Sequence, residues 1–367
     1  MKPARVADPS LQQWNYTSHR GVQRSRARLV LAALAVLLIA FFLLSMIVGS
    51  VWVPVGRVVS IFLGDQTPGP ESIIVMDVRL PQALTALLAG AALGIAGLQM
   101  QTLFRNPLAD PFALGIASGA SLGVALVLLA SGSAAYGVLS SSLGLFGDAM
   151  VTLASIVGAA AALSLVLSLS TRVENPATVL ILGLMIGYAA SAFVMVLVAG
   201  ADPAKLQRWI AWGFGSFSGV TWKRLSIFAP LIVSGLAIAA ATTKQLDALL
   251  LGENYARSLG LSVERTRMVT MAGASILGGV VTAFCGPIAF LGVAIPHLCR
   301  AILGTSDHRV LVPATMLMGG IVALGAQLIS LAPGNAGVLP LNAVTALLGA
   351  PVVIFVLMRN RSGVFVG

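Results

Sequence analysis

Residues that could do chemistry are few in this chain, and their spacing fits none of the common catalytic motifs. No G-x-x-x-x-G-K-[ST] loop occurs, and none of the four lysines follows a glycine, so the backbone cradle for a nucleotide phosphate is missing. His297 and His308 have no carboxylate at metalloprotease spacing. Cys285 and Cys299 both lie in apolar runs and are interpreted as buried thiols. We therefore expect no catalytic residue, no metal site, no cofactor and no covalent chemistry.

The composition of the chain indicates the class of protein to which it belongs. Of 367 residues, 58% are apolar and only 9% are charged, and the mean hydropathy is +0.97. A soluble domain has about 25% charged residues, so this chain lacks the polar surface that water requires. Disordered chains, collagens and coiled coils do not contain this much apolar bulk either. The sequence predicts an all-α, polytopic membrane protein.

Ten apolar stretches qualify as membrane-spanning helices, each of which needs about 20 residues to cross a bilayer. They are residues 29–48, 83–104, 114–132, 149–170, 177–200, 225–243, 268–285, 287–303, 310–331 and 340–358. Gly286-Pro287 favours two spans over one long broken segment between residues 268 and 303. The first stretch is too long for the apolar region of a signal peptide.

The distribution of basic residues predicts the orientation. With ten spans and the N-terminus inside, 16 of the 22 Lys and Arg residues lie on the inner side and 6 on the outer side, in agreement with the positive-inside rule. Residues 1–28 are then a basic cytoplasmic tail, residues 29–358 the transmembrane domain, and residues 359–367 a second cytoplasmic tail. The net charge of +10 follows from this topology. The expected surroundings are the lipid bilayer of the cytoplasmic (inner) membrane, and no nucleic acid is expected as a partner because no basic soluble module is present.

The middle of every predicted span lacks acidic and basic side chains. Ion-coupled carriers usually place such groups there as proton relays or ion partners. Some carriers bind Na⁺ with backbone carbonyls alone, so an ion-coupled secondary carrier that needs no ATPase stays an alternative. A sealed membrane anchor is a third possibility. If the chain transports a solute uphill, we expect another polypeptide to supply the energy.

Small residues and helix breaks indicate how the spans are arranged. Glycines at one-turn spacing, such as Gly90 and Gly94, favour close helix packing. Asn106-Pro107 and Gly286-Pro287 are expected to break helices, which is tolerated at membrane depth where the backbone is buried in protein or lines a cavity. The segment PFALGIA at 111–117 is similar to PIAFLGVA at 287–294. In the predicted topology the two segments run in opposite directions, as in inverted-repeat halves.

Six stretches carry the most specific signal. They are RLPQALTALLAGAALGIAGLQMQTLFRNPLADPFALGIASGAS at 79–121, WGFGSFSGVTW at 212–222, LGENYARSLGLSVERTR at 251–267, GPIAFLGVAIPHL at 286–298, TSDHRVLVP at 305–313 and LPLNAVTALLGAP at 339–351. With these stretches the chain resembles the FecCD-type permease subunits of ATP-binding-cassette (ABC) importers for iron-siderophore complexes, haem and cobalamin. The resemblance covers roughly residues 29–358. It implies a ten-helix permease with both termini inside, as the charge distribution also predicts.

This resemblance implies the partners and the function. The partners are two cytoplasmic ATPase subunits, an extracytoplasmic substrate-binding protein and a second permease copy, in a homodimer or a heterodimer. The chain itself is then no enzyme, because ATP is hydrolysed by a partner. Its expected cargo is an iron chelate, a ferric siderophore first, with haem and cobalamin as the other choices.

The resemblance also implies a coupling surface in the loop between the sixth and seventh spans, about residues 245–267. Its residues are Leu251, Gly252, Glu253, Tyr255, Ala256, Arg257, Leu259 and Gly260. A short polar helix ended by Gly260 is suited to transmit movement from a groove of the ATPase. Glu253 and Arg257 are four residues apart and are expected to form a pair on one helix face. An ordinary solvated loop is the alternative.

Two further surfaces follow from the resemblance. Arg79 matches the first position of the family's RLPR motif and is expected to meet acidic residues of the binding protein, although Gln82 replaces the second arginine and Val338 replaces an acidic residue. A headgroup anchor is the alternative role for Arg79. The other expected docking residues are Arg57, Lys205 and Arg208. The translocation pathway is expected between two permease copies, lined by residues 177–200 and a short helix at 204–214, with Met185 and Tyr188 as candidate pathway residues.

Overall fold

The computed structural model describes residues 9–49, 51–64, 69–129, 148–173, 175–332 and 337–360. Every regular element in these ranges is a helix. Residues 1–8 and 361–367 of the two predicted tails, and residues 130–132 of the third predicted span, lie outside the described residues.

The helices follow one another along the chain, with η1 a π-helix and η2 a 3₁₀-helix. They are α1 (Pro9–Ile47), α2 (Val55–Phe62), α3 (Pro70–Ile73), η1 (Ile74–Arg79), α4 (Leu80–Leu103), η2 (Pro111–Leu114), α5 (Ile116–Leu128), α7 (Asp148–Ser170), α8 (Pro176–Ala199), α9 (Pro203–Gly213), α10 (Trp222–Ala241), α11 (Thr243–Leu250), α12 (Glu253–Ser258), α13 (Val263–Cys285), α14 (Leu291–Leu303), α15 (His308–Leu331) and α16 (Leu341–Asn360).

Each of the ten predicted spans coincides with one helix of the structure. Seven helical segments are long and apolar enough to cross a membrane, and three shorter apolar helices (α5, α14 and α16) account for the other predicted spans. Two segments are longer than expected. The helix that contains the first span begins at Pro9, and the second span is part of one helical segment from Pro70 to Leu103.

The two shortest span helices have the same surroundings in each half of the chain. Both α5 and α14 have 13 residues, or about 20 Å, which is less than the bilayer core of about 30 Å. Each follows a long helix and a break: α4 and η2 precede α5, while α13 and the segment at Gly286 precede α14. Gly286 has φ +75°, a backbone conformation that glycine adopts without strain. The two halves of the chain thus share the same succession of a long helix, a break and a short helix.

The helix α4 lies at the centre of the molecule. It packs against α15, α13, α14, α10 and α1, and most of its residues are buried. The predicted glycine contacts are present, since Gly90 lies against the backbone of Gly319 in α15. Pro111 at the first break contacts Gly278 of α13, and Gly97 of α4 lies against Gly292 of α14. Both cysteines, Cys285 and Cys299, are free and buried.

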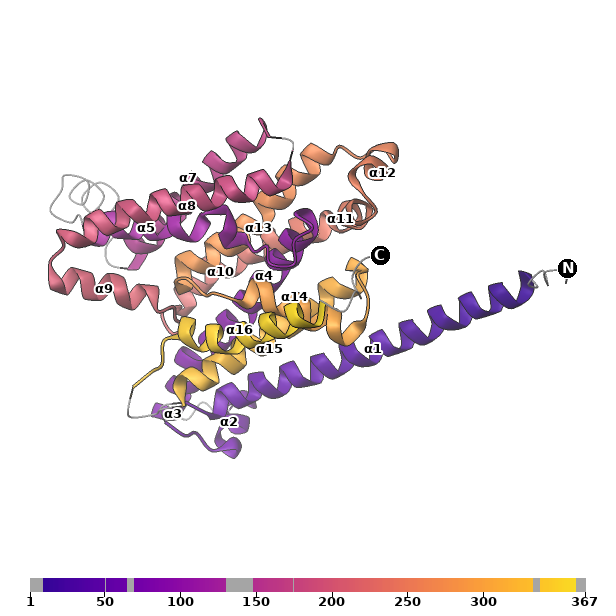
Figure 1. Ribbon diagram of the computed structural model, residues 1–367. Coiled ribbons are helices and arrows are strands. Elements are labelled where there is room, and N and C mark those ends of the chain that lie inside the picture. The colour runs from indigo at the N-terminus through magenta and orange to yellow at the C-terminus, as the bar shows by residue number, and fades with distance from the viewer. Residues whose placement is uncertain are drawn as a thin grey trace, which may run out of the picture.

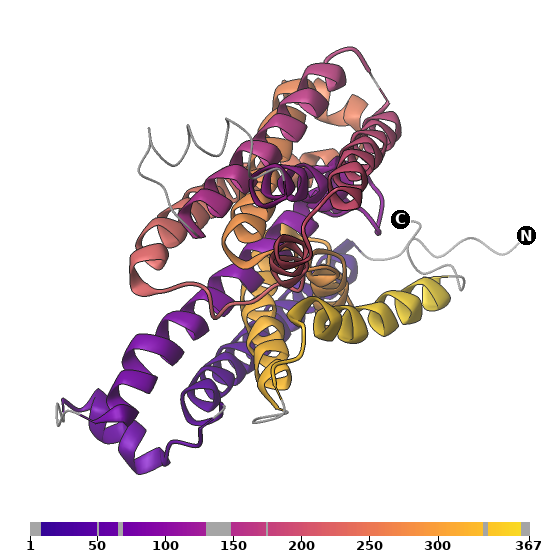
Figure 2. The same cartoon turned by 90° about the vertical axis from the view of Figure 1, so that its left-hand side faces the viewer.

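The helices α5, α7 and α8 form a second group beside this centre. The helix α5 packs against α7 and α8, and α13 joins the two groups through its contacts with α7 and α5. The molecule has two distinct ends (Figure 1): α2, α3 and α9 lie at one, and α11 and α12 at the other. The first residue of α1 and the last of α16 both lie toward the end with α11 and α12, and Figure 2 views the molecule from the opposite end.

Gly97→Ala should destabilise the protein, because a Cβ at this position would collide with the carbonyl group of Gly292. Overpacking of this kind costs about 1–3 kcal/mol of unfolding free energy. Thermal unfolding in detergent should show a lower midpoint for this variant. The matched control is Gly56→Ala in α2, where no neighbouring atom lies within 4 Å of the added Cβ. Equal midpoints for the two variants would contradict the packing described.

Candidate functional site

The segment between α10 and α13 folds into two short helices, α11 and α12, of which sequence analysis expected only the second. Gly252 separates them with φ +118°, and Gly260 follows α12 with φ +81°. Both conformations are unfavourable for residues with a Cβ. The two glycines therefore set the direction in which α12 leaves α11 and joins α13.

Three of the predicted coupling residues are large, apolar and exposed, and they lie in or directly beside α12. Leu251, Tyr255 and Leu259 are spaced four residues apart and are 69%, 49% and 58% exposed. Only Tyr255 lies within α12; Leu251 precedes the turn at Gly252, and Leu259 directly follows the last residue of the helix. Ala256 is fully buried. Three large apolar side chains exposed around one short helix are unusual for a segment that faces water alone, and they are suited to a groove on a partner protein.

The pairing predicted for Glu253 was wrong. Its carboxylate lies 3.1 Å from a guanidinium nitrogen of Arg267, the fifth residue of α13, instead of pairing with Arg257. Arg257 is exposed. A contact between α12 and α13 is favoured because the Arg267 side chain is only 8% exposed and requires a nearby anion or acceptors. Sequence analysis missed Arg267, since nothing in the spacing indicates that α13 turns this side chain toward α12.

The expected display of Arg79 at the surface was also wrong. Arg79 is the last residue of η1, and only 6% of it is exposed. Its Nη1 donates a hydrogen bond of 2.6 Å to the carbonyl of Met46, and its Nη2 donates to the carbonyl of Val51. Carbonyls at the end of a helix lack intrahelical donors, and α1 ends at Ile47. Arg79 therefore satisfies the C-terminal end of α1 and is not available for docking or for a lipid headgroup.

The other predicted docking residues lie on α2 and α9. Arg57 forms an ion pair of 3.1 Å with Glu71. Lys205 and Arg208 both belong to α9, and Arg208 is exposed. The short helix predicted after the fifth span is thus confirmed as α9, and it carries two cations at the end of the molecule opposite α12 (Figure 1).

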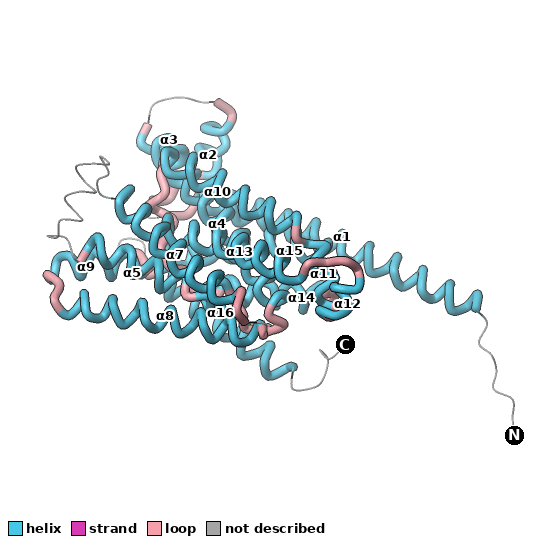
Figure 3. Tube along the Cα trace, turned by 90° about the horizontal axis from the view of Figure 1, so that it is seen from above, coloured by secondary structure: helices cyan, strands magenta, loops and turns pink. Residues whose placement is uncertain are grey.

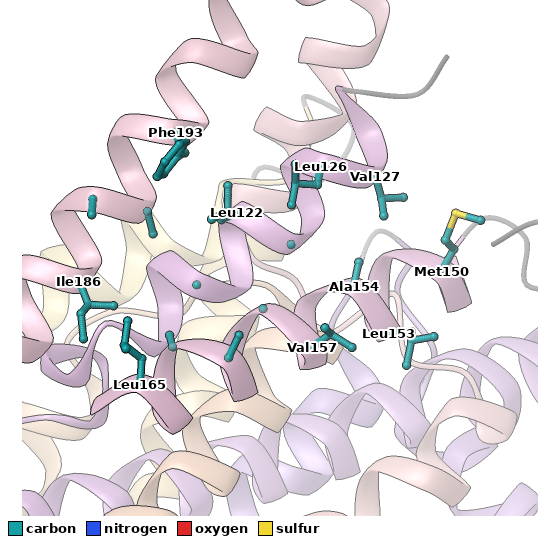
Figure 4. A pocket seen from close by; sticks show the side chains of 17 residues that line it. Leu122, Leu126, Val127, Met150, Leu153, Ala154, Val157, Leu165, Ile186 and Phe193 are labelled. Atoms are coloured by element: carbon teal, nitrogen blue, oxygen red, sulfur yellow. The ribbon is translucent and has the colours of Figure 1, made fainter. Parts of the chain in front are cut away.

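The candidate pathway residues lie on an exposed face of α8. Met185 is 52% exposed and Tyr188 is 67% exposed. Neither lines the cavity shown in Figure 4, which has a volume of about 610 Å³ and lies between α5, α7 and α8. All 17 residues that line this cavity are apolar or glycine, with Leu126 and Phe193 among them. A cavity without hydrogen-bonding side chains is suited to hydrocarbon and offers nothing to orient a polar cargo.

The predicted helix breaks are held by side chains. Asn106 Oδ1 accepts a hydrogen bond from the backbone N–H of Leu108 (3.0 Å), and the Nε2 atom of His297 lies 2.7 Å from the carbonyl oxygen of Pro107. In the second break Asn342 Oδ1 accepts from the N–H of Ala289 (3.0 Å) after Gly286-Pro287. These contacts satisfy backbone groups that the breaks release.

Asp110 caps the start of η2 and accepts a 2.9 Å hydrogen bond from the backbone N–H of Ala113. Desolvation raises the pKa of its carboxyl to about 6, although backbone N–H groups lower it. Across the described residues, no group of three or more His, Cys, Asp and Glu side chains could hold a metal ion.

Comparison with known proteins places this geometry in a family. The model of the FecCD transport family matches residues 21–359. The chain belongs to this family. The vitamin B12 import system permease protein BtuC of Klebsiella pneumoniae is 35% identical over 340 residues, covering 93% of this chain and 96% of that protein. BtuC of Escherichia coli strain HS is 35% identical over 346 residues, with coverage of 94% and 99%.

A solved structure agrees with this assignment. It is described as an inward-facing conformation of an ABC transporter of the metal-chelate type, and it matches with a TM-score of 0.76 at 26% identity. The match covers 90% of this chain and 99% of that one. The FecCD-family chain is therefore a multi-pass permease subunit of an ABC importer in the inner membrane. Permeases of this kind work with separate ATPase subunits and a substrate-binding protein, and these relatives give no support to the secondary carrier.

Arg79→Met should destabilise the permease, because the carbonyls of Met46 and Val51 lose a charged donor. Hydrogen bonds to charged groups contribute about 1.5–3 kcal/mol, so the midpoint of thermal unfolding should fall clearly. The matched control is Arg57→Met, which breaks a partly exposed ion pair worth at most about 1 kcal/mol. If Arg79→Met changed the midpoint no more than Arg57→Met, the capping role would be refuted.

Proposed function

We propose that this permease imports a bulky metal chelate and is driven by two ATPase subunits that bind its α12 helix. The observation that carries the proposal is the exposure of three large apolar side chains in and directly beside α12, Leu251, Tyr255 and Leu259, while the neighbouring Ala256 is buried. Exposed apolar side chains on a short helix and at its two ends fit the helix-in-groove mode of recognition. The ion pair of Glu253 with Arg267 supports the proposal because it ties α12 to the membrane helix α13.

The cargo class follows from the relatives. The two permeases at 35% identity are named for vitamin B12, and the similar structure is described as of the metal-chelate type. Ferric siderophore is the cargo that we place first, with cobalamin and haem as the other members of the class. All three are bulky molecules in which an organic ligand surrounds a metal.

The pathway is proposed to lie between this chain and a second permease copy, either identical or a sister chain. The exposed face of α8 supports this arrangement because it displays large apolar side chains in addition to Met185 and Tyr188. A partner surface would cover part of this face, while the rest would line a passage with weak affinity for the cargo. Weak binding is an advantage in a pathway, since the cargo must leave as well as enter.

The test is reconstitution of the permease with its ATPase and binding protein in liposomes. Three arms would use radiolabelled ferric hydroxamate, cyanocobalamin and haem as probes. We expect ATP-dependent uptake of one of the three, with ferric hydroxamate first. Uptake by the permease alone, without nucleotide or partners, would contradict the proposal and favour the secondary carrier. No ATP-dependent uptake in any arm would contradict the cargo class.

Gly260→Pro in the same liposomes tests the coupling surface. Proline fixes φ near −65°, whereas Gly260 has φ +81°, and its N–H donates to the Arg257 carbonyl at 2.9 Å. We expect the variant to insert in the membrane but to lose ATPase binding and uptake. Gly260→Ala keeps the N–H and costs about 1–2 kcal/mol of strain, so its loss should be smaller. Normal ATPase recruitment by Gly260→Pro would overturn the assignment.

Docking of the binding protein is proposed to involve Arg57, Lys205 and Arg208. Arg208→Glu should lower the association rate about tenfold at low salt, with a smaller effect at high salt, because surface charges steer encounter and salt screens them. Arg172→Glu is the matched control, since this exposed residue lies just before the start of α8, at the end away from α9. Surface plasmon resonance over a salt series would measure both rates, and equal rates would contradict docking at α9.

A further inference from the structure

The short helix α11 lies between α12 and the centre of the molecule. It contacts α12 on one side and α4, α15 and α10 on the other (Figure 3). Two of its residues, Leu246 and Leu249, are buried. A displacement of α12 therefore reaches the membrane helices through α11 as well as through the direct connection of α12 to α13.

Polar contacts attach both ends of α11 to α4. At the start of α11, Gln99 Nε2 donates a hydrogen bond of 3.1 Å to Thr242 Oγ1. At its end, an Nη2 atom of Arg105 donates a hydrogen bond of 2.8 Å to the carbonyl of Leu249. A cation at this position also interacts favourably with the negative end of the helix dipole.

A third contact attaches the middle of α11 to α15 and, through it, to α4. Asp247 Oδ1 lies 2.6 Å from Nδ1 of His308 and 3.2 Å from the backbone N of the same residue. His308 is the first residue of α15, so the carboxylate faces the positive end of that helix dipole. The other ring nitrogen, Nε2, lies 2.9 Å from Thr102 Oγ1 of α4.

The residues on α4 follow a helical pattern. Gln99 and Thr102 are three residues apart and share one face of the helix. Arg105 follows three residues later, just beyond the end of α4, and has φ +46°. Non-glycine residues rarely adopt this conformation, and here it accompanies a side chain that reaches α11. We call this set of contacts the α11 junction: Gln99 with Thr242 at the start of α11, Arg105 and His308 with α11 itself, and Thr102 with His308.

We propose that the α11 junction transmits the movement of α12 to α4 and α15, and that Asp247 and His308 are positioning residues for coupling. This inference rests on the proposed coupling role of α12. The junction is suited to the task because α4 is the central helix, which packs against most of the long helices around it. Movement of α11 must either displace the ends of α4 and α15 or break charged and buried hydrogen bonds, and breaking them is costly.

The experiment compares two carboxylates at the start of α15 in the reconstituted complex with ATPase and binding protein. Asp247→Ala removes the link between α11 and α15. Asp307→Ala, the matched control, removes an exposed carboxylate that caps the same helix through the N–H of Arg309. The readout is the ratio of binding-protein-stimulated to basal ATP hydrolysis, normalised to assembled complex, because a purely structural loss does not change this ratio.

We expect Asp247→Ala to lower the ratio by at least about fivefold, the lower bound for a typical coupling between sites, and Asp307→Ala to leave it unchanged. His308→Ala should give the same loss, and the double variant should be no worse than either single variant, because all three break one link. Additive losses, equal losses for Asp247→Ala and Asp307→Ala, or no loss would each overturn the inference.

Thr102→Val provides a second variant if Asp247→Ala does not assemble. It removes the hydroxyl that contacts His308 and nearly preserves the side-chain volume. A lower ratio in this variant supports the junction, and an unchanged ratio overturns it. The wild-type complex separates this inference from the proposed function. If the wild-type permease recruits no ATPase, the proposed function fails; if it is stimulated normally and all the variants are as well, only the α11 junction fails.

Discussion

Hydrocarbon offers no water to a backbone N–H or C=O that is released where a helix ends or breaks, and the architecture of this permease depends on how those groups are satisfied. Several polar side chains are used for this purpose. Arg79 binds the carbonyl of Met46 at the end of α1 and that of Val51 after it. Asn342 binds the N–H of Ala289, and Gln101 binds the carbonyl of Val293 in α14. Arg300 in turn donates to Gln101 Oε1 at 2.5 Å. The sequence therefore requires few polar residues, because backbone N–H and C=O groups are released only where helices end or break.

Between those points the helices are held by shape. Lipid chains are as apolar as leucine, so burial of leucine against leucine contributes little to helix association in a bilayer. Close backbone contact contributes more, and it requires residues without bulk. The pairs Gly90 with Gly319 and Gly97 with Gly292 bring α4 into contact with two different helices. The central helix α4 is therefore rich in glycine and alanine, and it packs against the helices around it without containing a charged residue.

Apolar run length and turn residues were enough to predict the ten spans and the break at Gly286-Pro287, while the helix α9 was predicted from the family resemblance. These features depend on local sequence, and local sequence can be read directly. The burial of Arg79 could not be predicted this way. It depends on how the end of α1 lies relative to η1, and these two elements come together only when the chain folds. The partner of Glu253 was missed for the same reason: helical spacing indicates Arg257, whereas the path set by Gly260 brings Arg267 within reach.

The residues of the α11 junction show the same limit more strongly. Asp247 and His308 are 61 positions apart, and Thr102 and His308 are 206 positions apart. Each is ordinary in its own segment: an aspartate on an amphipathic turn, a histidine after a polar loop, a threonine near the end of an apolar run. Only the three-dimensional arrangement joins them. Long-range polar contacts of this kind produce no periodic pattern in the sequence. The apolar packing around them does, because it repeats with the turns of a helix.

Both native thiols, Cys285 and Cys299, are shielded by surrounding side chains. The permease therefore has little background reactivity toward maleimides and spin-label reagents, which require an accessible thiolate. A single cysteine introduced on the surface can then carry a fluorophore or a nitroxide without prior replacement of the two native cysteines. Distances between such labels can follow the opening and closing of the transporter in a membrane, in a background that keeps its natural core intact.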